Sequence, residues 1–176
     1  MYLASTLKMG GHIVDILDIP ALKWDYKKIL KYLQSNTFDL VGLSCNIFTL
    51  REAITMSIII KKFKPDTYVV IGGASTIYPN QKILAKTSKI DFIIRGDGET
   101  PLLELCNALE NGNPLNKIPN LTYRTPQGQI IENINEVITN LSEIPSPLFD
   151  SIDIDKYRLH PPYLRKKPFM IISTSR

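Results

Sequence analysis

Small and glycine residues follow three apolar runs of this sequence, and such residues suit the binding of a large ligand. The runs with their endings are LVGLSCN at 40–46, VVIGGAST at 69–76 and FIIRGDGET at 92–100. Adjacent glycines permit positive φ angles and let a flat ligand approach the backbone, because no Cβ stands in the way. Acid–base groups are scarce, since only Asp97 and Glu99 could serve. The pattern therefore predicts a cradle for a large cofactor.

The elements that must position these turns alternate along the chain. We predict helices at 2–9, 24–33, 47–63, 79–86 and 100–109, with strands at 12–18, 40–45, 67–71 and 90–94. This order indicates an α/β fold with a parallel sheet covered on both faces. The carboxyl ends of parallel strands lie along one edge, where open α/β sheets bind ligands, so the three turns should converge there.

The fold class expected is a flavodoxin-like (Rossmann-like) doubly wound parallel sheet. A doubly wound domain normally begins with a strand that lies inside its sheet, whereas this sequence begins on a helix. We therefore expect the fold to lack its first strand.

Each turn also has a purely structural interpretation. Thr49 and Ser44 could cap the helix that follows them, and the Gly72–Gly73 pair could form only a tight turn. Glu99 would be stabilised by the dipole of the helix that it precedes. For that helix Thr100 is the expected N-cap and Gly112 the stop. Both interpretations stay open at this point.

The remaining reactive side chains indicate packing. Cys45 and Cys106 stand far apart, without metal-ligand spacing, and are expected to be reduced packing residues. His12 follows a glycine pair and is expected to be structural. No catalytic residue and no metal ligand is predicted.

Composition narrows the class of protein. The chain has 176 residues, a hydrophobic share of 44%, a charged share of 22% and a formal net charge of +4. Its charge is modest and spread out, so we expect no nucleic-acid partner. The apolar runs are too short to span a bilayer and no secretory signal is visible. The expected location is cytoplasmic.

The sequence pattern changes after Gly112, where the alternation of helices and strands ends. Two short β-like runs surround Pro126-Gln127-Gly128 at 120–132, which predicts a hairpin. An extended, proline-rich connector follows at 140–162, and the closing run at 168–176 is a strand candidate. The expected division is a ligand-binding domain at 1–112, a hairpin extension at 113–139, and a linker with a strand at 140–176.

The strings GGH-x-V-x-x-x-D, D-L-V-G-L-S, V-V-I-G-G and D-F-I-I-R-G-D-G-E-T-P-L-L-E-L resemble one family. The chain is similar to the N-terminal cobalamin-binding domain of cobalamin-dependent radical S-adenosylmethionine enzymes. These include methyltransferases and the anaerobic magnesium-protoporphyrin monomethyl ester cyclase type. The resemblance implies cobalamin as the cofactor. It places a [4Fe-4S] cluster and S-adenosylmethionine in a downstream radical domain of the parent chain, whose first strand would be 168–176.

The resemblance also implies three sets of cofactor-binding residues, one in each turn. These are Ser44, Cys45, Asn46 and Thr49; Gly72, Gly73, Ala74 and Ser75; and Gly96, Asp97, Gly98 and Glu99. The family's first strand and its loop would precede Met1, so 168–173 or a neighbouring chain is expected to fill the gap. The fragment alone is expected to be inactive.

Two other functions remain open from the residues. One is an enzyme that binds a nucleotide or sugar-nucleotide at the same edge, with Asp97 or Glu99 as its acid or base. The other is a receiver-like interaction domain with a filled, apolar edge. The sequence lacks the third glycine of a dinucleotide fingerprint and the lysine string of a phosphate loop, which disfavours the first.

Overall fold

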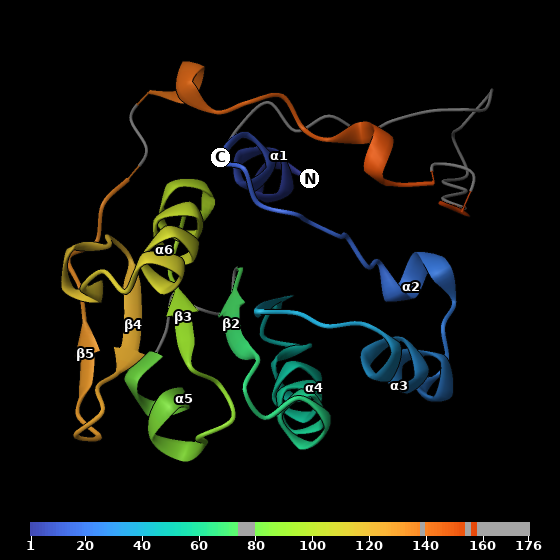
Figure 1. Ribbon diagram of the computed structural model, residues 1–176, viewed down its shortest axis with the longest axis horizontal. Helices are drawn as coiled ribbons and strands as arrows, with labels where there is room; N and C mark the ends of the chain where they lie inside the picture. The colour runs from blue at the N-terminus through green and yellow to red at the C-terminus, as the bar shows by residue number, and fades with distance from the viewer. Residues whose placement is uncertain (74–79, 138–139, 154–155, 158–176) are drawn as a thin grey trace.

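The computed structural model describes residues 1–73, 80–137, 140–153 and 156–157 of the chain (Figure 1). Its helices are α1 (Tyr2–Met9), α2 (Ile19–Leu22), α3 (Tyr26–Ser35), α4 (Leu50–Phe63), α5 (Asn80–Lys86) and α6 (Glu99–Asn111). Its strands are β1 (Leu40–Ser44), β2 (Tyr68–Gly72), β3 (Phe92–Ile94), β4 (Leu121–Arg124) and β5 (Ile130–Glu132). Short 3-10 turns lie at Leu115–Lys117, Leu141–Glu143 and Phe149–Ser151.

One sheet of five strands forms the centre, in the order β1-β2-β3-β4-β5. The first three strands are parallel, and β4 and β5 join them antiparallel as a hairpin. The register pairs Ser44 with Gly72 and Ile71 with Ile93, so these strands end level with one another. The predicted convergence of the three turns at one sheet edge is therefore confirmed.

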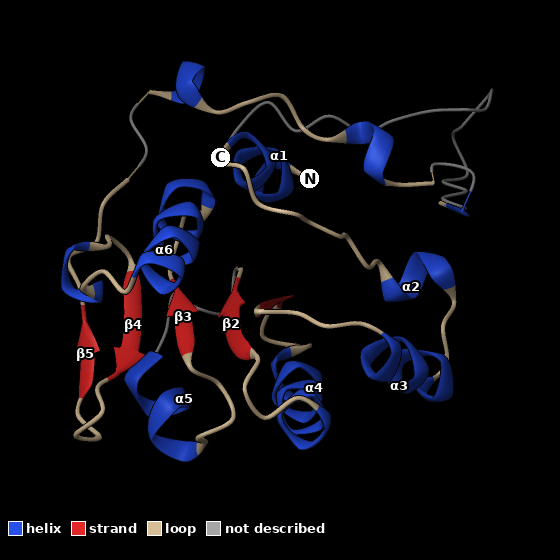
Figure 2. Cartoon of the chain, in the orientation of Figure 1, coloured by secondary structure: helices blue, strands red, loops and turns tan. Residues whose placement is uncertain are grey.

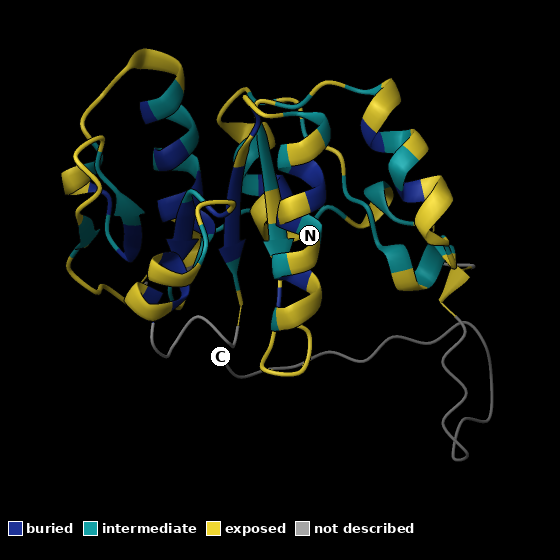
Figure 3. Ribbon diagram, turned by 90° about the horizontal axis from the view of Figure 1, so that it is seen from below, coloured by how far each residue is buried: buried dark blue, intermediate teal, exposed yellow. Residues whose placement is uncertain are grey.

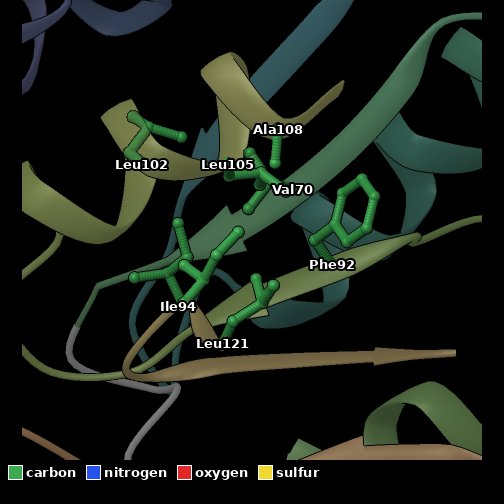
Figure 4. Packing of buried hydrophobic residues seen from close by; sticks show 8 residues of the cluster. Val70, Phe92, Ile94, Leu102, Leu105, Ala108 and Leu121 are labelled. Carbon is green, nitrogen blue, oxygen red and sulfur yellow. The ribbon is translucent and has the colours of Figure 1, made fainter. Parts of the chain in front are cut away.

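Helices cover both faces of this sheet, as the alternating pattern predicted (Figure 1). Successive residues of a strand point to opposite faces. Val70 accordingly packs in a cluster with Leu102 and Leu105 of α6, whose side chains converge on the sheet in Figure 4. The neighbouring Val69 packs with residues of α3 and α4 instead. The strands contribute Val69, Ile71, Ile93 and Leu121 to the fully buried apolar side chains, and the buried residues form the dark centre of Figure 3.

Residues 12–18 form no strand, so that sequence prediction was wrong. The segment runs as an extended connection between α1 and α2 (Figure 2). A strand needs a hydrogen-bonding neighbour, and none of the described strands lies beside this segment. His12 has the structural role that was expected, because its Nε2 lies 3.0 Å from Asn107 Oδ1. This contact joins the segment to α6.

The observed helix boundaries confirm one predicted helix end and correct two predicted helix starts. Gly112 ends α6 in the left-handed conformation (φ +68), as predicted. Thr100 is not the N-cap, because α6 already begins at Glu99 and Gly98 takes the cap position. The helix predicted at 47–63 begins only at Leu50, because 47–49 form a turn.

The predicted hairpin is present and is tied to the end of β3. Arg95 lies directly after β3 and its guanidinium forms an ion pair with Glu132 at 2.7 Å. The same guanidinium donates to the carbonyl of Asn133. Asn120 exchanges two hydrogen bonds with the backbone of Glu136, at 2.8 and 2.7 Å. These contacts make the hairpin a continuation of the sheet.

The closing run at 168–176 lies outside the described residues, as does the expectation that 168–173 fills a gap beside the sheet. Part of the connector is described, and there Tyr157 donates a 2.6 Å hydrogen bond from its hydroxyl to Asp18. No helix in the described ranges is both long enough and apolar enough to cross a membrane.

Candidate functional site

The carboxyl ends of β1 and β2 touch through their backbones. The amide of Cys45 donates a 2.9 Å hydrogen bond to the carbonyl of Gly72. Gly73 follows with φ +105, and a Cβ at this position would lie only 2.6 Å from the Cys45 carbonyl oxygen. A side chain here would collide with backbone, so the fold itself requires glycine at 73. Because Gly73 is also exposed, the edge carries a strip of bare backbone.

The turn after β1 is held by its own polar groups. Asn46 accepts hydrogen bonds at Oδ1 from the amides of Phe48 and Thr49, at 2.9 and 3.1 Å. Thr49 accepts one at Oγ1 from the amide of Asn46, at 3.0 Å. These bonds close the turn at 46–49 that precedes α4, with the Asn46 side chain in the manner of an Asx turn. Thr49 takes the N-cap position of α4, but its side chain makes no cap hydrogen bond to the helix and bonds to Asn46 instead.

The two remaining predicted residues of this turn differ in exposure. Ser44 is exposed at the tip of β1 and its Oγ lies 3.4 Å from the position of a Gly73 Cβ. Cys45 is 4% exposed and packs in a cluster with Ala53 and Ile71. Ser44 is therefore available to a ligand, whereas the thiol of Cys45 belongs to the core.

Cys106 lies on α6, away from the three turns. Burial raises the pKa of its thiol to about 11, and the charge of Glu110 acts in the same direction. Cys45 and Cys106 form no disulfide bond in the structure. Their environments are those of packing residues.

The third turn follows β3 and leads into α6. Gly96 has φ +62 with open space around it, while a Cβ at Gly98 would lie 3.2 Å from Leu3 of α1. Glu99 is 4% exposed in the first turn of α6. That position is electrostatically favourable for a carboxylate, in agreement with the structural interpretation. Asp97 is only partly buried between the two glycines.

The structure thus brings together most of the predicted site residues at one edge. The backbone at the end of β2 also lies close to the backbone at the end of β3, because a Cβ at Gly72 would lie 3.6 Å from the Ile94 carbonyl oxygen. Ala74 and Ser75 lie outside the described residues. The arrangement offers glycine backbone and the Ser44 hydroxyl, and it suits the contact of a flat ligand more than acid–base catalysis.

Sequence reasoning missed two residues of this edge. Ile47 and Phe48 stand 72% and 86% exposed in the turn after β1. They were assigned to a helix, in which apolar residues are expected to face the core. The signal that could have revealed them is Asn46, because an Asn side chain often forms a turn by accepting from the amide two residues later.

Comparison with known proteins agrees with this geometry. A family model described as the B12 binding domain matches residues 1–106. An uncharacterised methyltransferase from Pyrococcus horikoshii is 30% identical over 175 residues, which are 99% of this chain and 37% of the relative. The anaerobic magnesium-protoporphyrin IX monomethyl ester cyclase from Synechocystis is 31% identical over 169 residues, which are 95% of this chain and 33% of the cyclase.

A solved structure shares the fold. It is the radical S-adenosylmethionine methyltransferase TsrM from Kitasatospora setae, with cobalamin and a [4Fe-4S] cluster bound. The TM-score is 0.64 at 24% identity, and the match covers 82% of this chain and 27% of TsrM. The chain spans about a third of the length of the curated relatives described above. Because the family model matches more than half of the residues, the chain belongs to the B12-binding domain family.

Proposed function

We propose that this chain binds cobalamin along the carboxyl edge of β1, β2 and β3. The observation that carries the proposal is the glycine backbone at 72–73, which is exposed at Gly73, where the Cys45 carbonyl excludes any side chain. Cobalamin has a long, flat nucleotide tail that needs a narrow path with small walls. The strip provides such a path, and the membership of the B12-binding family supports this choice of ligand.

The residues divide by what they can offer to cobalamin. Gly72 and Gly73 would lie under the tail, and the exposed hydroxyl of Ser44 would donate to it or accept from it. Gly96 and Asp97 would border the other side of the path, with Gly98 and Glu99 fixing the start of α6 behind them. Asn46 and Thr49 would hold the shape of their turn, since each already bonds to the other's backbone. The Cys45 thiol faces the core and would not contact the cofactor.

Bound cobalamin would supply methyl-carrying or radical chemistry in a parent enzyme. We propose that the parent is a radical S-adenosylmethionine enzyme of methyltransferase or cyclase type, whose downstream domain holds the [4Fe-4S] cluster. The likeness to relatives about three times as long supports this arrangement. The division at about 112 and 140 into binding domain, hairpin extension and linker is part of the same proposal.

The proposal is tested by titrating the protein with hydroxocobalamin and monitoring the visible absorbance of the cofactor. The matched variants are Ser44→Phe and Ser88→Phe, because both serines are exposed and Ser88 lies in the connection before β3, at the opposite sheet edge. A phenyl group at 44 would obstruct the path, so we expect at least a tenfold loss of affinity, equal to about 1.4 kcal/mol. Ser88→Phe should bind as the wild type does.

The other functions considered predict different results. A nucleotide or sugar-nucleotide enzyme would be stabilised in a thermal-shift assay by those ligands and not by cobalamin. A receiver-like interaction domain would respond to neither ligand. Wild-type protein that does not bind hydroxocobalamin, or equal affinity in the two phenylalanine variants, would contradict the proposed site.

A further inference from the structure

The turn between β1 and α4 presents two large apolar side chains, Ile47 and Phe48, side by side at the proposed cobalamin edge. They are 72% and 86% exposed. We infer that this pair forms an apolar platform for the corrin ring, while the nucleotide tail follows the glycine strip. The inference rests on the proposed function and assigns to the ring a contact of its own.

The local hydrogen bonds fix where these side chains stand. The amide of Phe48 donates to Asn46 Oδ1 at 2.9 Å, and the amide of Thr49 donates to the Asn46 carbonyl at 3.0 Å. Both ends of the turn are therefore anchored, and its backbone cannot rotate to bury the two side chains without breaking these bonds. An exposed phenyl ring on an anchored backbone loses little further freedom when it meets a ligand.

The same bonds decide which kind of contact the turn can make. The amides of Cys45, Asn46, Phe48 and Thr49 all donate within the protein. What the turn offers to a ligand is therefore mainly hydrocarbon surface. A corrin ring is a broad, flat macrocycle that carries methyl groups, so it suits apolar contact better than the phosphate-bearing tail does.

The position of the pair selects the corrin as the occupant. Ile47 is two residues from Cys45, whose carbonyl oxygen would lie 2.6 Å from a Cβ at Gly73. The platform is thus continuous with the strip proposed for the tail, and both lie within residues 1–106 of the B12-binding family match. The glycine strip has no side chains and suits the narrow nucleotide tail. The platform has two large apolar side chains and suits the broad corrin ring.

The test compares cobalamin with cobinamide, a corrinoid that lacks the nucleotide tail. Each is titrated by visible absorbance against the full 176-residue chain and the variants Ile47→Ala and Phe48→Ala. Truncation of Phe48 should weaken both corrinoids by a similar factor of about ten or more, and truncation of Ile47 by a smaller factor. Ser44→Phe should weaken cobalamin much more than cobinamide, because it obstructs the path of the tail.

Matched controls are Ile13→Ala and Met9→Ala. Ile13 is 100% and Met9 73% exposed, and both lie near the end of α1, where His12 contacts Asn107 in the second half of α6. These truncations remove exposed apolar groups far from the carboxyl edge and should leave both affinities unchanged. Thermal unfolding of every variant verifies that the fold is retained.

The possible outcomes separate this inference from the proposed function. Unchanged corrinoid affinity in folded Phe48→Ala, with intact wild-type binding, overturns the platform and leaves cobalamin binding in place. A loss that affects cobalamin but not cobinamide places Phe48 at the tail and also overturns it. Wild-type protein that binds neither corrinoid refutes the proposed function, and the platform falls with it.

Discussion

Replacement of Gly73 by alanine gives the sharpest test of the backbone geometry at the sheet edge. Gly73 has φ +105, and a strained backbone of this kind costs a residue with a Cβ about 1–3 kcal/mol. The new Cβ would also lie 2.6 Å from the Cys45 carbonyl oxygen, so the backbones of the two turns must separate. That displacement costs about another 1–2 kcal/mol, by analogy with overpacked cores. The free energy of unfolding should therefore fall by about 2–5 kcal/mol.

Two other glycines separate the contributions of strain and collision. Gly112 has φ +68 with nothing within 4 Å of its Cβ position, so Gly112→Ala should cost only about 1–2 kcal/mol. A Cβ at Gly42 would meet Val70 Cγ1 at an ordinary 3.8 Å, and Gly42→Ala should be neutral or slightly stabilising.

Thermal unfolding followed by circular dichroism measures all three variants. For a chain of this size each kcal/mol lowers Tm by about 2–4 °C, so a loss of about 2–5 kcal/mol should lower the Tm of Gly73→Ala by roughly 4–20 °C. If its Tm equals that of Gly112→Ala, the collision with the Cys45 carbonyl does not exist. If it equals that of Gly42→Ala, the positive φ is also refuted.

Two further predictions concern titratable groups of α6. Burial, with Glu110 adding to the effect, raises the pKa of Cys106 to about 11, so only about one thiol in a thousand is ionised at pH 8 and a thiol-reactive dye should label the native chain very slowly. Rapid labelling of one thiol without denaturant would contradict this environment. Burial, and to a smaller extent the charge of Glu136, raises the pKa of Glu104. The folded state therefore binds the proton more tightly than the unfolded state does, and this stabilises the fold below the ordinary carboxyl pKa. The stabilisation is lost as pH rises through the raised pKa. Glu104→Gln should therefore gain Tm relative to wild type between about pH 4 and pH 7, and a difference that stays constant with pH would refute the shift.

The centre of the parallel sheet could be predicted because β2 and β3 carry consecutive buried residues, which face both sides of the sheet. A continuous apolar run such as VVI at 69–71 can be recognised as a strand without knowledge of its partner. The parallel direction of β1, β2 and β3 follows from the helices that connect them. The convergence of Ser44, Gly72 and Gly96 at one edge followed from topology alone. Gly112 was predictable for a local reason, since the left-handed end of a helix favours glycine.

The wrong predictions depended on contacts between distant residues. The run at 12–18 alternates as a strand does, but strand formation requires a neighbour that local pattern cannot supply. Thr100 was a plausible cap by type, yet α6 extends one residue further toward Gly98, where Leu3 of α1 packs 3.2 Å from the Cβ position.

The chemistry of the site was only partly visible in the sequence. The family resemblance placed Asn46 and Thr49 among the cofactor contacts, and the structure adds that both side chains form hydrogen bonds within their turn. Arg95 could not be placed at all, because its partner Glu132 is 37 residues away. Glycine positions were informative because their conformation is set locally, while polar side chains depend on partners that only the fold assembles.

The two outer strands of the sheet differ in what they expose. On one side β5 is three residues long and follows a tight turn, and short border strands recruit foreign strands poorly. On the other side β1 is five residues long and pairs only with β2 among the described strands, so one row of its amides and carbonyls faces away from the sheet. Among the described strands, β1 is therefore the border strand along which self-association at high concentration should begin.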